Sequence, residues 1–127
     1  MEKAKVYAPS VVRIGIALVF LWFGISQVTD PSVWTALIPD YVKALPLSDM
    51  QLVLGNGIFE IIFGTLLLIG LWTRISALLL SIHLLHILTV VGYNAIGVRD
   101  FGLLLACVSI FLYGADPFSV DGKRANL

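Results

Sequence analysis

The stretch LVLGNGIFEIIFGTLLLIGL, residues 52–71, is a long apolar run with one carboxylate, Glu60, near its middle. A helix needs about 20 predominantly apolar residues to cross the ~30 Å hydrocarbon core of a bilayer, and this run has that length. A carboxylate at the centre of a membrane span costs roughly 3 kcal/mol to insert, so it usually faces the inside of a bundle and is tied to function. The stretch therefore predicts a membrane-spanning helix that carries a candidate functional residue.

The composition of the whole chain agrees with a membrane protein. Of its 127 residues, 59% are hydrophobic and 13% are charged, whereas soluble domains carry about 25% charged residues. Eight acidic residues balance eight basic ones, so no basic surface for nucleic acid is predicted. The one cysteine, Cys107, excludes an internal disulfide, a CxxC redox pair and a multi-cysteine metal site, and its apolar neighbours predict a buried core residue.

Four apolar segments make the chain one transmembrane domain, residues 1–127. Because every backbone polar group must be paired in lipid, we expect each segment to be a helix. The first begins after Lys3 and Lys5 like a signal peptide, but no convincing cleavage site follows Trp22, so we expect it to be retained. The sequence thus predicts an all-α, integral membrane four-helix bundle. Its spans are residues 10–28, 51–71, 74–93 and 98–114, and residues 29–50 form an external loop.

The lysines and arginines predict how the four spans are oriented. Six of them fall on one side of the membrane and two, Lys43 and Arg99, fall on the other. The more basic side is expected to be cytoplasmic. Both termini are therefore predicted in the cytoplasm, in a multi-pass protein of the inner (cytoplasmic) membrane. The six residues are Lys3, Lys5, Arg13, Arg74, Lys123 and Arg124.

The external loop, residues 29–50, mixes aromatic residues such as Trp34 and Tyr41 with three prolines. Aromatic and aliphatic residues with few charges are typical of short helices lying at the membrane interface. A plain loop with interfacial aromatic residues and a lid over a site that opens to the outer face are the alternatives.

Glu60 and the two histidines are predicted to lie at one depth in the bilayer. At 1.5 Å per helical residue, Glu60 is about 16 Å from the end of its span at Leu71. By the same rise, His83 and His86 are about 13 Å and 18 Å from the start of the next span. These two spans are consecutive and antiparallel, so we expect Glu60 to pair with a histidine across their hairpin. His83 and His86, three residues apart, share a helix face.

Further polar residues extend this candidate site. Asn56, Glu60 and Gly64 follow one another every four residues, as on a helix face turned to the bundle interior. The alternative is that such side chains only join helices by hydrogen bonds, each worth about 0.6–2 kcal/mol. A structural pair of Arg99 and Asp100 is the corresponding alternative at the last span. Towards the outer side the polar column is expected to include Gln27, Asn56, Asn94, Arg99 and Asp100.

Small residues within the spans are expected at helix contacts. Glycine lets two helix backbones approach closely, and small residues four apart are typical of such contacts in membranes. Gly102 and Ala106 form one pair of this kind. The glycines concerned are those at positions 15, 24, 57, 64 and 102.

Two kinds of bound group are compatible with Glu60, His83 and His86. Together they would form a two-histidine, one-carboxylate set for a metal ion, although no metal is predicted. The histidines cannot supply both axial ligands of one haem, because those ligands come from opposite faces. A quinone site is the more natural interpretation, with a histidine donating a hydrogen bond to a quinone oxygen and Glu60 passing protons.

The segment EIIFGTLLLIGLWTRISA, residues 60–77, resembles the signature of the DoxX family. The segments RIGIALVFLWFG, residues 13–24, and RDFGL, residues 99–103, are similar to the same family pattern, so the resemblance covers nearly the whole chain. The resemblance implies a four-helix membrane bundle, and Glu60 and Arg74 match positions of the family's sequence pattern. Named members include a subunit of a thiosulfate:quinone oxidoreductase, and others are associated with membrane redox complexes and oxidative stress. The chain lacks the CxxC of relatives that use a dithiol, which argues against thiol exchange.

The sequence and the resemblance together predict a quinone-linked redox component of the membrane. Glu60, His83 and His86 are the predicted catalytic residues of an intramembrane pocket. Because the chain has no nucleotide, flavin or iron–sulfur motif, its electrons must come from a redox partner in the membrane or beside it. A homo-oligomer is compatible with this prediction. The alternative is a non-enzymatic accessory or structural subunit, or a carrier of small molecules or lipids. The predicted cofactor-binding residues are Asn56, Arg74, Asn94 and Arg99, with the two arginines also anchoring helix ends.

Overall fold

The computed structural model of the protein describes residues 2–125, and over that range it is helical without β-strands. Four helices are long and apolar enough to cross a membrane, which confirms the predicted all-α, four-span architecture. Their bounds lie within three residues of those predicted. The helices are α1 (Glu2–Lys5), α2 (Ala8–Thr29), η1 (Pro31–Leu37), η2 (Val42–Ala44), α3 (Asp49–Ile69), α4 (Thr73–Val91), α5 (Ala95–Tyr113) and α6 (Val120–Ala125), where η denotes a 3₁₀ helix.

Both ends of α3 follow from local chemistry. Ser48 precedes the helix, and its hydroxyl accepts a hydrogen bond from the backbone N–H of Gln51 at 3.1 Å. The Gln51 side chain accepts one in return from the Ser48 N–H at 3.0 Å, which completes a capping box. At the other end Gly70 adopts a left-handed conformation, with φ of 76°, and stops the helix. The α3 helix therefore begins and ends two residues earlier than the span predicted from hydropathy.

The last span also begins earlier than predicted, at Ala95. The reason is Asn94, whose side-chain oxygen accepts a hydrogen bond from the backbone N–H of Gly97 at 2.9 Å. This is a standard N-terminal cap, and it places Arg99 and Asp100 inside the helix, in its second turn. Asn94 thus has a structural contact that explains its position without a ligand.

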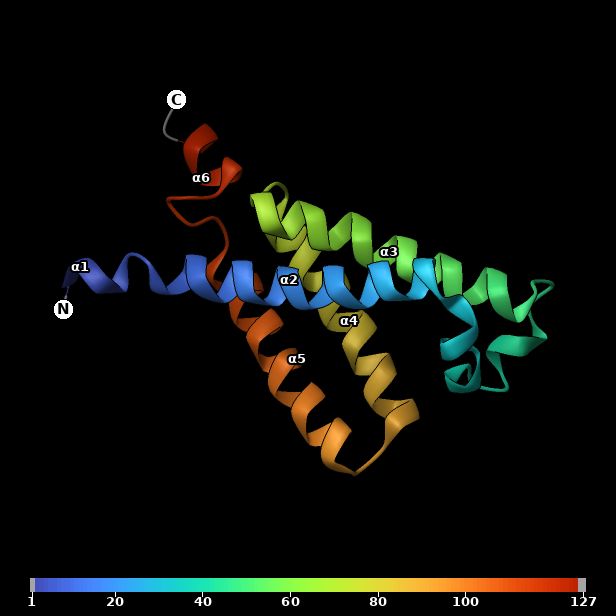
Figure 1. Ribbon diagram of the computed structural model, residues 1–127. Helices are drawn as coiled ribbons and strands as arrows, with labels where there is room; N and C mark the ends of the chain where they lie inside the picture. Colours follow the sequence, from blue (N-terminus) through green and yellow to red (C-terminus); the bar gives the residue numbers. More distant parts are fainter. Residues whose placement is uncertain (1, 126–127) are drawn as a thin grey trace.

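Helices α2 and α3 run alongside each other, whereas the α4–α5 hairpin crosses them at an angle (Figure 1). The turn between α4 and α5 points away from the α2–α3 pair in this view. The core lies where the two pairs meet, and Cys107 is fully buried there, as predicted. The buried apolar residues of this core are Ile16, Ala17, Phe20, Leu67, Ala77, Leu80, Leu84, Cys107 and Ile110.

Three of the five glycines expected at helix contacts do allow a close approach. A Cβ atom added to Gly24 would lie 2.8 Å from the carbonyl oxygen of Gly57, and one added to Gly57 would lie 2.9 Å from the oxygen of Gly24. Gly64 lies against Leu21 in a looser contact of the same kind. The expectation was wrong for Gly15 and Gly102, which have open space beside them because they lie away from the helix contacts of the chain.

The loop between α2 and α3 folds into the two short helices η1 and η2. Trp34 of η1 packs edge-on against Phe23 of α2, with ring centroids 5.8 Å apart. Tyr41, which precedes η2, contacts His86 of α4. The loop therefore contacts both α2 and α4.

Candidate functional site

Glu60 lies near the middle of α3 and is 3% exposed. One of its carboxylate oxygens, Oε1, is 2.9 Å from Nε2 of His83 on α4. The predicted pairing of Glu60 with a histidine across the α3–α4 hairpin is thus present in the structure. His83 is also central in its helix, ten residues after Thr73 and eight before Val91.

Two amides complete the surroundings of Glu60. Gln27 of α2 donates a hydrogen bond from Nε2 to Oε2 of Glu60 at 3.0 Å. Asn56, one turn earlier on α3, donates from Nδ2 to Oε1 of Glu60 at 3.3 Å and also contacts Oε1 of Gln27. We call Gln27, Asn56, Glu60 and His83 the Glu60 cluster. Its hydrogen bonds join three helices, α2, α3 and α4, around one buried carboxylate.

The Glu60 cluster depends on the close contact between α2 and α3. Gly24 and Gly57 bring the two backbones together, and Gln27 lies one turn beyond Gly24 on the same helix face. At that position its amide reaches Asn56 and Glu60 on the facing helix. A bulkier residue at either glycine would push the helices apart and lengthen these hydrogen bonds.

The two histidines have different surroundings. His83 is largely buried, with 14% of its side chain exposed, and its ring lies 5.0 Å from that of Phe59 at a tilt of 44°. His86 is exposed on α4, and its Nε2 forms a hydrogen bond with the hydroxyl of Tyr41. The sequence prediction grouped both histidines with Glu60, but only His83 contacts it. His86 instead links α4 to the loop between α2 and α3.

The remaining predicted site residues lie in other contacts. Arg74 donates a hydrogen bond to the carbonyl oxygen of Leu112 at 3.4 Å and so ties the start of α4 to the end of α5. Asn94 caps α5. Arg99 pairs with its neighbour Asp100 at 3.3 Å, with most of the arginine side chain exposed. Arg74, Asn94 and Arg99 thus form no hydrogen bond or ion pair with the Glu60 cluster. Within residues 2–125, no three His, Cys, Asp or Glu side chains are grouped closely enough to hold a metal ion.

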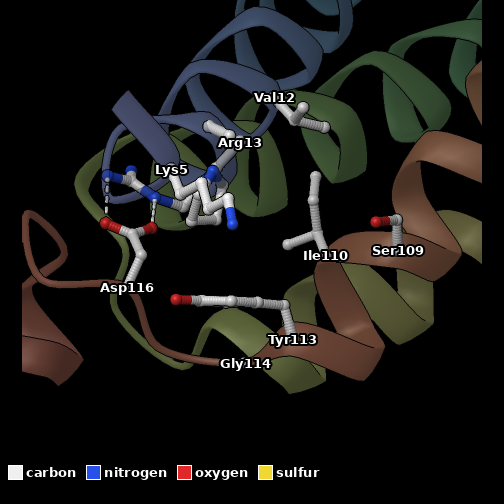
Figure 2. Close-up of a pocket in the computed structure, with 10 residues that line it drawn as sticks. Lys5, Val12, Arg13, Ser109, Ile110, Tyr113, Gly114 and Asp116 are labelled. Atoms are coloured by element: carbon white, nitrogen blue, oxygen red, sulfur yellow. Dashed lines mark hydrogen bonds and ion pairs between the residues drawn. The ribbon is translucent and has the colours of Figure 1, made fainter. Parts of the chain in front are cut away.

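A second buried polar group, not predicted from the sequence, joins Arg13 to Asp116. Nε of Arg13 is 2.6 Å from Oδ2 of Asp116, and the two side chains are 2% and 1% exposed. Ser10 donates a hydrogen bond to the same carboxylate at 2.6 Å. Figure 2 shows this ion pair at the edge of a cavity at the end of the bundle that carries both termini. From its sequence position Arg13 was expected to be a charge flanking the membrane, whereas the structure places it inside the protein.

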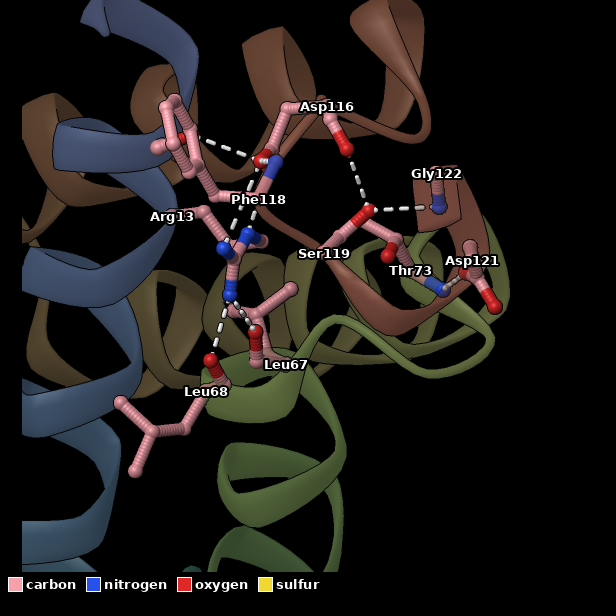
Figure 3. Close-up of polar contacts among 10 residues, drawn as sticks. Arg13, Leu67, Leu68, Thr73, Asp116, Phe118, Ser119, Asp121 and Gly122 are labelled. Carbon is pink, nitrogen blue, oxygen red and sulfur yellow. Dashed lines mark hydrogen bonds and ion pairs between the residues drawn. The ribbon is translucent and has the colours of Figure 1, made fainter. Parts of the chain in front are cut away.

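Arg13 also holds the end of α3. Its Nη1 donates to the carbonyl oxygen of Leu67 at 3.0 Å and to that of Leu68, and both carbonyls lie in the last turn of the helix (Figure 3). Carbonyl oxygens in the last turn lack the usual backbone donor four residues further on, so a cation is favourable at this end. The useful signal in the sequence was Asp116 itself, an acidic residue just after the last span and on the same side of the bundle as Arg13.

The segment that follows α5 folds back over the α3–α4 turn. The carboxylate of Asp121 accepts hydrogen bonds from the backbone N–H groups of Thr73 at 2.7 Å and Trp72 at 3.0 Å. The N–H of Asp121 in turn donates to the carbonyl oxygen of Gly70 at 2.9 Å. Asp121 therefore caps α4 from a distant part of the chain.

These contacts also set the protonation of the two carboxylates. Burial alone would raise the pKa of Asp116, but hydrogen bonds from Arg13, Ser10 and the backbone of Phe118 outweigh it, so this pKa lies below its ordinary value. Burial likewise opposes the charged form of Asp121, and backbone hydrogen bonds from Thr73 and Trp72 outweigh it, so its pKa is lowered too. Both side chains are thus carboxylates at neutral pH.

A comparison with protein families finds that the model of the DoxX family matches residues 8–92, more than half of the chain. The match includes α2, α3 and α4, and so includes every member of the Glu60 cluster. Comparisons with curated proteins and with solved structures found no match.

Proposed function

The chain belongs to the DoxX family, and from this premise we propose that it is a quinone-linked redox component of the inner membrane. The observation that carries the proposal is the pair of Glu60 and His83, with its Oε1–Nε2 distance of 2.9 Å, in the middle of two membrane-spanning helices. A buried carboxylate in contact with an imidazole is a combination that membrane proteins use to hold and transfer protons.

The chemistry assigned to this pair is proton delivery. Reduction of a quinone to a quinol takes up two electrons and two protons. The electrons come from a redox partner protein, because the sequence has no motif for a nucleotide, a flavin or an iron–sulfur cluster. Glu60 passes each proton to His83, and the carboxylate that remains stabilises the imidazolium until the proton is released to a quinone oxygen. Water at the membrane surface resupplies both protons.

The surroundings of the two histidines support the proposal that a quinone reaches them from the bilayer. His86 and Tyr41 are both exposed, and their hydrogen bond lies on the surface of α4 three residues beyond His83. An imidazole and a phenol are both able to donate a hydrogen bond to a quinone oxygen. The Phe59 ring next to His83 offers an aromatic surface for the quinone ring. These side chains support a quinone as the substrate.

The proposal is tested by quinone binding to the protein in lipid nanodiscs. Ubiquinone and menaquinone analogues with short tails are titrated, and quenching of tryptophan fluorescence reports binding. We expect saturable binding that His86→Ala weakens at least tenfold. Glu60→Gln and His83→Gln are expected to retain binding but to slow quinol formation when an electron donor is supplied.

Ile82→Ala is the matched control for these variants. Ile82 is 57% exposed on α4, directly before His83, and its loss leaves the polar contacts unchanged. Quinone binding that does not saturate, or that the His86 and Ile82 variants weaken equally, would reject the proposal.

One observation favours a second candidate function. Both oxygens of Glu60 accept hydrogen bonds from side chains of the chain itself, so the cluster also serves to hold α2, α3 and α4 together. In this interpretation the protein is an accessory or structural subunit of a membrane complex, or a carrier of small molecules or lipids. Absence of quinone binding, together with purification in a stable complex that Glu60→Gln leaves intact, would favour this second function.

A further inference from the structure

A cavity of about 330 Å³ lies between the start of α2 and the end of α5, at the end of the bundle that carries both termini. Its walls are apolar where Pro9, Val12 and Ile110 line it. Lys5, Ser109 and Tyr113 also line it, and Figure 2 shows these polar side chains around the same space. The cavity is therefore amphipathic, and it lies where two membrane spans end.

The polar side chains of the cavity are available to a ligand. Among residues 2–125, the ammonium group of Lys5 pairs with Glu2 alone, at 2.9 Å, and the two side chains are largely exposed, 72% and 88%. Exposed pairs of this kind contribute little free energy, so an incoming anion can replace Glu2. In the part of the chain that the structure describes, the hydroxyls of Ser109 and Tyr113 take part in no hydrogen bond, and both residues are exposed.

The charge of the cavity favours an anion. Arg13 and Asp116 line its inner side, but they neutralise each other in the buried pair described above, so Asp116 does not repel an anion with a full charge. Lys5 is then the charge of the lining that an incoming anion can pair with, since Glu2 does not line the cavity. At the same end of the bundle the basic residues Lys3, Lys5, Lys123 and Arg124 outnumber the carboxylates Glu2 and Asp121 of α1 and α6.

We propose that this cavity binds the headgroup of an anionic phospholipid, with one acyl chain along its apolar wall. Lys5 pairs with the phosphate, and the hydroxyls of Ser109 and Tyr113 donate hydrogen bonds to its oxygens. Basic pockets between membrane helices at the interface are suited to such headgroups. A tyrosine in the last turn of a span is also typical of the interface. A free phosphate has the same headgroup chemistry, but it leaves the apolar walls uncovered.

The test compares lipids and variants by native mass spectrometry of the protein released from nanodiscs, with lipid-dependent thermal stability as a second measurement. The probes are phosphatidylglycerol, phosphatidylcholine, and glycerophosphoglycerol, which has the headgroup but no acyl chains. We expect retention of phosphatidylglycerol over phosphatidylcholine, and no binding of glycerophosphoglycerol or inorganic phosphate at the same concentration. Lys5→Ala is expected to weaken phosphatidylglycerol binding about fivefold, and Tyr113→Phe with Ser109→Ala to weaken it further.

Lys123→Ala is the matched control, because it removes one positive charge at the same end of the bundle from a residue that does not line the cavity. It should change binding less than twofold. Equal effects of the Lys5 and Lys123 variants would show a general charge effect and would overturn the proposal. Equal binding of the two lipids would overturn it as well, and so would binding of inorganic phosphate as tight as that of the lipid. Lys5, Ser109 and Tyr113 are all exposed, so these variants should fold, which circular dichroism verifies.

Discussion

Arg13 and Asp116 are 103 residues apart in the chain, yet they form an ion pair of 2.6 Å in which both side chains are almost completely buried. The pair connects the first membrane span to the segment after the last one. Through the carbonyl oxygens of Leu67 and Leu68 it also holds the end of α3. Three of the elements that meet at this end of the bundle therefore depend on one guanidinium group.

Removing one partner of this pair should destabilise the protein strongly. Asp116→Ala leaves the guanidinium of Arg13 buried without its counter-charge, and breaking a buried pair in this way costs about 3–5 kcal/mol. The free energy of unfolding, measured in mild detergent with a chemical denaturant, is the quantity to compare.

A double variant distinguishes the cost of an unpaired buried charge from the cost of losing the two side chains. Arg13→Met with Asp116→Leu removes both charges and fills similar space, so it should be more stable than Asp116→Ala alone. Glu2→Ala is the control, because it removes an acidic residue at an exposed pair and should change stability by less than about 0.5 kcal/mol. If the double variant is no more stable than Asp116→Ala, then the unpaired charge of Arg13 is not what destabilises the single variant.

The lowered pKa of Asp116 predicts how stability depends on pH. An unfolded aspartic acid titrates near its ordinary pKa of about 4. Because the folded pKa is lower, the ion pair contributes its full stabilisation above that ordinary value. The contribution is lost as the pH falls from there through the lowered pKa of the folded protein.

Thermal unfolding in detergent, followed from about pH 7 to about pH 3, checks this dependence. The midpoint should stay level and then fall at the acidic end. Asp116→Asn should be less stable at neutral pH and should lose part of the acidic decline, while Asp121, whose pKa is also lowered, retains the rest. An unchanged acidic decline in Asp116→Asn would argue that other carboxyl groups cause it.

The four spans could be predicted to within three residues because hydropathy is a local property of the sequence, whereas the caps decide where each helix begins and ends. Hydropathy locates the four helices. The ends of α3 are defined locally, by the side-chain cap of Ser48 and the left-handed backbone of Gly70. Helix rise and the short hairpin leave little freedom, so the pairing of Glu60 with a histidine could be predicted, though not which of the two. Such features need no knowledge of how the helices rotate or tilt.

The remaining contacts depend on tertiary packing. His83 and His86 share a helix face, and only the rotation and tilt of α4 decide that His83 contacts Glu60 while His86 contacts Tyr41. A basic residue near the start of an apolar run usually marks the membrane surface. Arg13 is buried instead, because the chain after α5 turns back and brings Asp116 to it.

The contact of Gly24 with Gly57 predicts a sharp difference among glycine variants. Gly57→Ala would place a Cβ atom 2.9 Å from the backbone oxygen of Gly24, which must force α2 and α3 apart. We expect a loss of about 1–3 kcal/mol in unfolding free energy, together with weaker hydrogen bonds in the Glu60 cluster. Gly102→Ala is the control, since open space lies beside Gly102, and there the better helix propensity of alanine should give a gain of up to about 1 kcal/mol. Similar losses for both variants would mean that the α2–α3 contact is not tight.

The pair of Glu60 and His83 should show energetic coupling that His86 lacks. Glu60→Leu leaves the donors of Gln27 and His83 without their acceptor, whereas Asn56 keeps the oxygen of Gln27, and each unsatisfied buried group costs about 1–3 kcal/mol. His83→Leu removes one of those donors, so the double variant should be more stable than the sum of the two single changes predicts, by about 0.5–3 kcal/mol.

The matched cycle replaces His83→Leu with His86→Leu. His86 is exposed and contacts Tyr41 rather than Glu60, so its effect should add to that of Glu60→Leu within about 0.5 kcal/mol. Unfolding in denaturant, measured for all variants in one detergent, gives both coupling energies. Equal coupling energies for the two histidines would contradict the finding that His83, and not His86, interacts with Glu60.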